Sequence, residues 1–145
     1  MKAPDLFSDS DRERIRLAVE QAESMTSGEI GVYIEDECKM EVLDRAAFVF
    51  AELNMHLTDL RNGVLIYLAV VDKKFAIIGD AGIHAKVGED FWNKIKEKMA
   101  ISFKESKFTD GLAHGILESG IALKNHFPHQ NDDKNELPND IIFGK

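Results

Sequence analysis

Apolar residues recur at helical spacing in four segments of the chain, and each segment predicts an amphipathic helix. The first begins at Ser10, where Ser10 and Glu13 fit the pattern of a capping box, and it runs to about Met25. The other three cover about residues 41–58, 88–103 and 109–127. Pro128 follows the last of them, and proline cannot continue a helix.

Three further segments predict β-strands. Residues 29–35 alternate between aliphatic residues on one face and Gly, Tyr or Glu on the other, which is the pattern of a half-buried strand. Residues 64–71 have no polar face, as is typical of a central strand covered on both sides. Residues 75–78 follow a turn at Asp72–Lys73, so the second and third strands should form an antiparallel hairpin.

The order of these elements predicts an α/β fold. The helix between the first two strands makes a right-handed crossover that leaves them parallel, whereas the third strand runs back in the opposite direction. The last helix contains Gly111, Gly115 and Gly120, which lower helix stability. We therefore expect this helix to pack closely against the sheet.

The 145 residues suffice for one domain with a full core. Pro128 divides the chain into a single domain, residues 1–128, and an acidic C-terminal tail, residues 129–145. The tail is polar until the apolar run Ile141–Phe143. Two interpretations of this run are open: a flexible tail, or a short strand added at an edge of the sheet.

The net charge of -8 argues against nucleic acids and anionic membranes as partners, because both present negative charge. No apolar segment approaches membrane-spanning length, and the first residues lack the apolar core of a signal sequence. Cys38 is the single cysteine, so no internal disulfide can form. We therefore expect a cytoplasmic protein with no nucleic-acid partner and no membrane partner.

Polar side chains gather where the predicted strands begin or end. Glu29 and Asn62 stand at the starts of the first two strands, and Asp80 follows the third, so all three should share one edge of the sheet. Asp59 precedes the second strand at the same edge. An acid in a loop after a buried strand is well placed for function, and we favour Asp80 most.

Two further groups of acids bear on the position of the site. If the last two helices pack antiparallel, the tail brings Asp132 and Glu136 to the edge of Asp80. The opposite edge has its own candidates, Asp36 and Asp110. Clustered loop carboxylates suit Ca²⁺ or Mg²⁺, which take oxygen ligands. The alternatives are a solvated acidic rim and, for Asp80, a cap on the loop that follows.

Three segments taken together resemble the TPM domain family: residues 26–30, 61–67 and 75–83. Residues 103–112, where a helix ends and a glycine-bearing helix begins, are also similar to the family. Residues 135–138 resemble the tail of short, stand-alone bacterial members. The resemblance covers about residues 8–128, nearly the whole chain.

This resemblance implies a three-layer α/β/α sandwich around a small mixed, mostly parallel sheet of three to four strands. The family includes a thylakoid-lumen protein with acid phosphatase activity, and binding of divalent cations occurs within it. Of the candidate residues, the loop of Asp80 is the one position that we carry over from the family.

Three hypotheses about function follow. The first is a soluble, stand-alone TPM domain that binds Ca²⁺ or Mg²⁺ through loop carboxylates around Asp80, with a metal-modulated regulatory or binding role. The second is a metal-dependent acid phosphatase, which rests on the family resemblance alone, so that enzyme activity is left open. The third is a metal-independent module that binds a protein partner through the tail or a helix surface.

Overall fold

The computed structural model describes residues 2–129 and 139–144, and these form an α/β fold. The helices are α1 (Asp9–Glu23), α2 (Val42–Glu52), α3 (Ala81–Val87), α4 (Asn93–Lys104) and α5 (Phe108–Leu123). The strands are β1 (Glu29–Glu35), β2 (Gly63–Ala69), β3 (Lys74–Gly79) and β4 (Ile142–Phe143). Short 3₁₀ helices lie at η1 (Ala3–Leu6), η2 (Met55–Leu57) and η3 (Glu89–Trp92). Within the described ranges, no helix is both long and apolar enough to cross a membrane.

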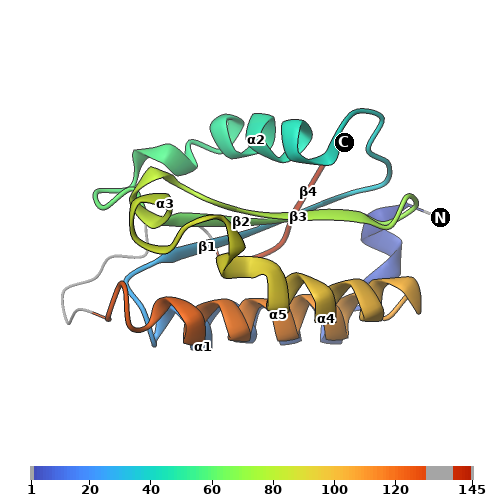
Figure 1. Cartoon of the computed structure of the whole chain (residues 1–145). Coiled ribbons are helices and arrows are strands. Elements are labelled where there is room, and N and C mark those ends of the chain that lie inside the picture. Colours follow the sequence, from blue (N-terminus) through green and yellow to red (C-terminus); the bar gives the residue numbers. More distant parts are fainter. Residues whose placement is uncertain (1, 130–138, 145) are drawn as a thin grey trace.

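The strands form one sheet in the order β3-β2-β1-β4 (Figure 1). β1 pairs in parallel with β2 and with β4, and β2 pairs antiparallel with β3. The predicted parallel pair, the hairpin and the mostly parallel sheet are therefore confirmed. Of the two interpretations of the C-terminal segment, the structure has the edge strand, in which Ile142 pairs with Tyr33 and Phe143 with Ile34.

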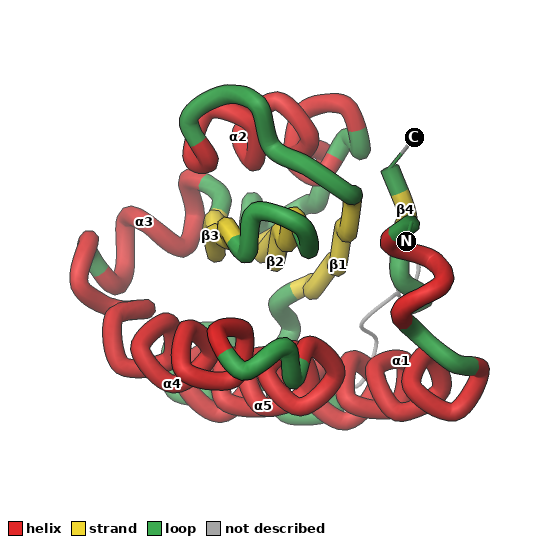
Figure 2. Tube along the Cα trace, turned by 90° about the vertical axis from the view of Figure 1, so that its right-hand side faces the viewer, coloured by secondary structure: helices red, strands yellow, loops and turns green. Residues whose placement is uncertain are grey.

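Helices cover both faces of the sheet and give the fold three layers (Figure 1, Figure 2). α2 covers one face, and α1, α4 and α5 form a layer on the other. In the end-on view of Figure 2, α3 lies beside the outer edge of β3. The α/β/α sandwich that the family resemblance implies is confirmed.

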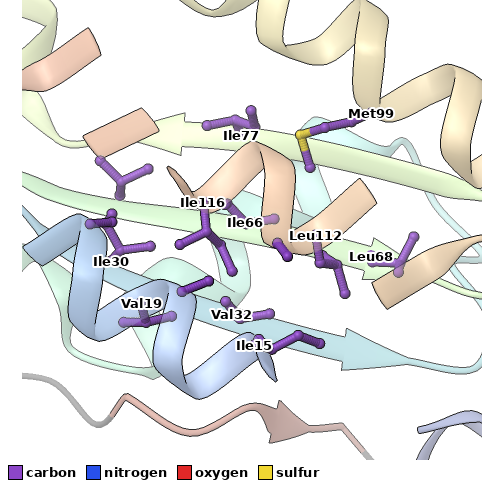
Figure 3. Packing of buried hydrophobic residues seen from close by; sticks show 14 of the residues in the cluster. Ile15, Val19, Ile30, Val32, Ile66, Leu68, Ile77, Met99, Leu112 and Ile116 are labelled. Carbon is purple, nitrogen blue, oxygen red and sulfur yellow. The ribbon is translucent and has the colours of Figure 1, made fainter. Parts of the chain in front are cut away.

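β2 is buried along its whole length and contributes to both hydrophobic cores of the protein. Val64, Ile66 and Leu68 join the core under α1, α4 and α5, where Figure 3 shows Ile66 and Leu68 among their neighbours. Leu65, Tyr67 and Ala69 join the core under α2. The prediction of a central strand covered on both sides is confirmed. Burial of each large side chain contributes roughly 1.5–3 kcal/mol to folding.

β1 departs from the prediction of a half-buried strand. Its aliphatic face lies in the core with α1 and α5. Its other face is covered by α2, so that Gly31 and Glu35 are buried and Tyr33 is half-buried. The alternation was misleading because the polar groups on this second face bind partners within the protein instead of water.

α1 begins with a capping box, but its first residue differs from the prediction. The N-cap is Ser8 and not Ser10: the Ser8 hydroxyl accepts from the Asp11 amide, and the Asp11 carboxylate accepts from the Ser8 amide, both at 3.0 Å. Aspartate serves here in the place of the usual glutamate, which is why the pattern with Glu13 was misleading.

Other helix boundaries also differ from the sequence predictions. The helix predicted over residues 41–58 ends at Glu52, because Asn54 takes a left-handed conformation with φ of 57°. The segment after Asp80 was expected to be a loop, yet it forms α3, whose seven residues are too few to show a helical period. The next predicted helix starts as η3 and becomes α-helical at Asn93.

The glycines of α5 face neighbouring helices and not the sheet, which corrects the prediction. A Cβ added at Gly111 or Gly115 would meet side chains of α4. A Cβ added at Gly120 would lie 2.8 Å from the Cα of Ala22 in α1, closer than real Cβ atoms approach. These glycines therefore let α1, α4 and α5 form one tightly packed layer.

Replacement of Gly120 by alanine should destabilise the protein. Alanine gains about 1 kcal/mol in helix propensity, but the new methyl group meets the backbone of α1, and overpacking of this kind costs about 1–3 kcal/mol. We expect a net loss of about 1 kcal/mol in the free energy of unfolding, measured by urea denaturation. Ile121→Ala, at an exposed position of α5, is the control. Equal stability of Gly120→Ala and the parent would contradict this packing.

Candidate functional site

Three segments meet at one edge of the sheet, where β1 and β2 begin and β3 ends. The backbone amide of Glu29 donates to the carbonyl of Asn62 at 3.2 Å, and the amide of Asp80 donates to the carbonyl of Gly63 at 2.9 Å. The predicted convergence of Glu29, Asn62 and Asp80 on one edge is confirmed. We call this region the strand-start edge.

Asp80 is 7% exposed, and its carboxylate binds donors from the protein. Arg61 contacts both oxygens, through Nε–Oδ2 at 2.7 Å and Nη2–Oδ1 at 2.9 Å, and the Ala81 amide donates to Oδ1 at 2.7 Å. Burial by itself would raise the pKa of Asp80, but these hydrogen bonds and the guanidinium charge outweigh burial and lower the pKa. A cation at Asp80 would have to displace Arg61.

Asp80 is also the N-cap of α3. The alternative prediction, that Asp80 acts as a cap, therefore agrees with its contacts, although the segment that it caps is a helix and not a loop. The helix is held against the loop before β2. The Gly82 amide donates to the Arg61 carbonyl at 2.8 Å, and a Cβ at Gly82 would lie 2.6 Å from that oxygen. This close approach requires glycine, and it fixes Arg61 beside Asp80.

A second buried acid at the strand-start edge, Glu29, differs from Asp80 because its neighbour is another acid and not an arginine. Glu29 is 5% exposed, and its Oε2 atom is shielded from solvent. The carboxyl group of Glu29 shares a hydrogen bond with that of Glu23 at the end of α1. Oε2 of Glu23 also accepts from the Ile30 amide at 3.0 Å. Burial and then the Glu29 charge raise the pKa of Glu23 to about 8, against the Ile30 hydrogen bond. The pair therefore holds a proton at neutral pH.

The chemistry of this pair fits a hard divalent cation. Ca²⁺ and Mg²⁺ take carboxylate oxygens as ligands and complete their shells with water. Two adjacent carboxylates repel each other when both are ionised, and a cation between them would relieve this repulsion in the same way as the proton does. Glu23 is only partly buried, so water has access to one side of the pair. Among the described residues, no three His, Cys, Asp or Glu side chains gather into a metal-binding group.

The remaining candidates of this edge have different environments. Asn62 is buried, and its side-chain amide donates to the Ser27 carbonyl at 3.2 Å, which ties the loop before β2 to the loop before β1. Asp59 is exposed. Asp132 and Glu136 lie outside the described residues.

The candidates of the opposite edge have separate partners. Asp36 accepts from the Ala3 amide at 2.6 Å and lies 3.5 Å from the Lys2 ammonium, so it holds the N-terminal segment. Asp110 forms an ion pair with Arg14, which links α5 to α1. Each acid thus joins two segments of the chain.

A buried polar network near this opposite edge was missed by the sequence analysis. Glu35 is 6% exposed and accepts two hydrogen bonds from Arg45 of α2, both at 2.8 Å, and one from the Tyr67 hydroxyl. Burial opposes ionisation of Glu35, but the hydrogen bonds from Arg45 and Tyr67 prevail and lower its pKa. Because Arg45 belongs to α2, Glu35 to β1 and Tyr67 to β2, this network fastens α2 to the sheet.

Two residues of the strand-start edge were also missed. Glu23 lies outside the apolar stripe of α1. From its position in the sequence it cannot be told apart from an ordinary solvent-exposed acid of a helix. Arg61 directly precedes Asn62, and an arginine placed at the same edge as a buried acid was an available signal. Neither partner could be assigned before the fold was known.

Glu23 should make the protein less stable as the pH rises. Its pKa of about 8 in the folded state exceeds the ordinary value of 4.5, so the folded state keeps a proton that the unfolded chain releases. The stability from this group is complete below about pH 4.5 and is lost as the pH rises through about 8. We expect the melting temperature to fall by roughly 5 °C between pH 5 and 8.5 because of this residue.

Glu23→Gln should remove most of that pH dependence, because glutamine cannot ionise and keeps an acceptor for the Ile30 amide. Asp59→Asn, at an exposed acid of the same edge, is the matched control and should keep the slope of the parent. Thermal unfolding followed by circular dichroism measures all three proteins. Identical slopes for Glu23→Gln and the parent would contradict the shared proton.

Comparison with known families gives one match that spans most of the chain. The model of the TPM domain, which carries the name TPM phosphatase, matches residues 2–120. No curated protein is similar enough to this chain to count as a match.

The solved structures that are similar to this chain include the following two. The NMR structure of the BA42 protein from the psychrophilic bacterium Bizionia argentinensis shares 44% sequence identity, covers 95% of both chains and superposes with a TM-score of 0.89. The solution NMR structure of the N-terminal domain of a protein from P. gingivalis has 16% identity and a TM-score of 0.71, and covers 89% of this chain and 84% of the other. The second similarity, at this low identity, concerns the fold alone.

Proposed function

This chain belongs to the TPM domain family, and from that premise we propose that it binds a divalent cation, Ca²⁺ or Mg²⁺, through Glu29 and Glu23. The observation that carries the proposal is the hydrogen-bonded pair of carboxyl groups where α1 ends and β1 begins. The cation has a regulatory or binding role and takes the place of the shared proton. The cytoplasmic location expected from the sequence remains a prediction.

The charges at the strand-start edge favour Glu29 over Asp80 as the principal ligand. The Asp80 carboxylate is neutralised by a guanidinium that contacts both of its oxygens. The Glu29 carboxylate faces a second acid instead, and the resulting repulsion is relieved at present by a proton. A divalent cation gains more from two neighbouring carboxylates than from an acid that is already paired with Arg61. Binding should release the proton of Glu23, since the ligands must be ionised.

The position of the pair suggests how a cation would act on the rest of the chain. Glu23 and Glu29 flank the loop between α1 and β1. In that loop the Ser27 amide donates to the Phe127 carbonyl at 2.9 Å, and the Thr26 hydroxyl donates to the same oxygen. A cation bound by Glu23 and Glu29 would connect the two ends of this loop and make the loop more rigid. The hydrogen bonds from the loop to Phe127, which hold the chain beyond α5, would become more rigid as well. This is the metal-modulated role that we propose.

Amide-resolved NMR titration of chelator-treated protein with Ca²⁺ and then Mg²⁺ tests the proposal. Saturable shifts should centre on the amides of residues 23–30. Glu29→Gln should weaken binding by at least about tenfold, because it removes a charged ligand. Asp59→Asn, which removes an exposed acid of the same edge, should leave the affinity within about twofold.

Calorimetric titration in buffers of different ionisation enthalpy provides a second readout. We expect release of roughly one proton per bound cation at pH 7 from the parent, and much less from Glu23→Gln. Weak shifts spread over all acidic surfaces, or a fall in affinity on Asp80→Asn that exceeds that of Glu29→Gln, would contradict the assignment to the carboxyl pair.

A metal-dependent acid phosphatase is the alternative function, and the name of the matching family model favours it. A bound cation would supply Lewis acidity toward a phosphoryl oxygen. The expected result is slow release of phosphate from an aryl phosphate, with loss of this activity in excess chelator and in Glu29→Gln. Activity that persists in both conditions would exclude hydrolysis at this pair.

A further inference from the structure

A hollow of about 370 Å³ lies at the outer edge of the sheet, separate from the carboxyl pair. It extends from α2 across β3 to α3 and the start of α4. The proposed cation site does not account for it. The residues that line it are Leu43, Ile77, Ile78, Gly79, Ile83, His84, Val87, Gly88, Trp92 and Lys96.

The floor of the hollow is apolar and belongs to the rigid core. Ile77, Ile83 and Trp92 are all buried members of the larger hydrophobic cluster. β3 is the outermost strand of the described sheet on this side, so the hollow opens at a strand edge. α3 lies beside that edge (Figure 2). A floor of this kind is preformed and favours the burial of an apolar ligand body.

The lining of the hollow includes a lysine ammonium, although the protein as a whole is negatively charged. The chain has a net charge of -8, yet among the residues whose side chains the structure describes, the ionisable ones that line the hollow are His84 and Lys96. His84 is exposed and Lys96 is half-buried, so both can present donors at the rim. A lysine ammonium and a histidine at the rim of an apolar hollow favour a ligand with an anionic head.

We propose that this hollow binds a small organic acid with an apolar body and a single carboxylate head. The body lies against the partly exposed Leu43, Ile78 and Val87, over a floor of Ile77, Ile83 and Trp92, and the carboxylate meets Lys96 and His84. The volume sets the size: 370 Å³ holds about a dozen water molecules at roughly 30 Å³ each, and hence a ligand of about a dozen non-hydrogen atoms.

A peptide strand added to the edge of β3 fits the geometry less well. The hollow exposes only Ile77, Ile78 and Gly79 of this strand, which is shorter than the five or six residues of a typical strand. The helix α3 occupies the space beside the end of β3 (Figure 2). An uncharged peptide strand would also offer no anionic group for Lys96 and His84 to contact.

Titration of the full chain with octanoate, followed by amide-resolved NMR, tests the proposal. We expect saturable shifts centred on residues 77–79, 83–88 and 92–96. Octan-1-ol has the same apolar body without the charge and should bind roughly fivefold more weakly. Acetate has the charge without the body and should not saturate. Octan-1-ol binding as tightly as octanoate would overturn the proposal, because the basic rim would then contribute nothing.

Charge variants locate the carboxylate. Lys96→Gln should weaken octanoate binding by roughly fivefold and leave octan-1-ol binding unchanged. Lys98→Gln, at an exposed position of α4 outside the hollow, removes the same charge and should change neither. Equal effects of the two variants would mean general charge attraction and would overturn the assignment to Lys96.

Two further titrations test other occupants of the hollow. An acetylated and amidated tri-valine peptide carries no charge, and dilution of the protein alone reports on self-association. We expect neither to shift the amides of the hollow. A larger response to the peptide would make the hollow a strand-docking site, and concentration-dependent shifts would make it a contact between copies of this chain. Either result would overturn the proposal of an organic acid.

Discussion

The burial of β2 on both faces is the constraint on which the rest of the structure depends. Val64, Ile66 and Leu68 point to one core and Leu65, Tyr67 and Ala69 to the other, so both faces need a cover of helices. α2 supplies one cover, and α1, α4 and α5 supply the other (Figure 1). The second cover is a layer of three helices, and the glycines of α5 let α1 and α4 approach it closely. The carboxyl groups at the edge of the sheet are positioned by this packing.

The strand-start edge shows two solutions to the burial of an acid. Asp80 is stabilised in its ionised form by Arg61, and its pKa is lowered. Glu29 lies beside Glu23, and burial together with the Glu29 charge raises the pKa of Glu23, so that the pair keeps a proton. The first arrangement is complete within the protein and serves to cap α3. The second arrangement leaves a position that a proton or a metal cation can fill, and this difference separates a structural carboxylate from a candidate ligand.

The two proposed sites use different edges and different physical forces. In the proposed cation site the carboxyl pair would attract a small hard cation by charge, whereas the hollow at β3 combines an apolar floor with a basic rim. Both sites lie at the margins of the sheet, beyond the helices that cover its two faces. Ligands of open α/β folds bind at edges of the sheet.

The sequence by itself determined the helices α1, α2, α4 and α5, the strands β1 to β3 with their parallel and antiparallel pairings, and the gathering of Glu29, Asn62 and Asp80 at one edge. These features follow from local periodicity and from the handedness of crossovers, which act over short stretches of chain. The tertiary structure alone decided that Arg61 pairs with Asp80 and that Glu23 pairs with Glu29. It also decided that α3 is a helix and that the glycines of α5 face other helices. These outcomes depend on which side chains meet across the layers, and local patterns carry no information about such contacts.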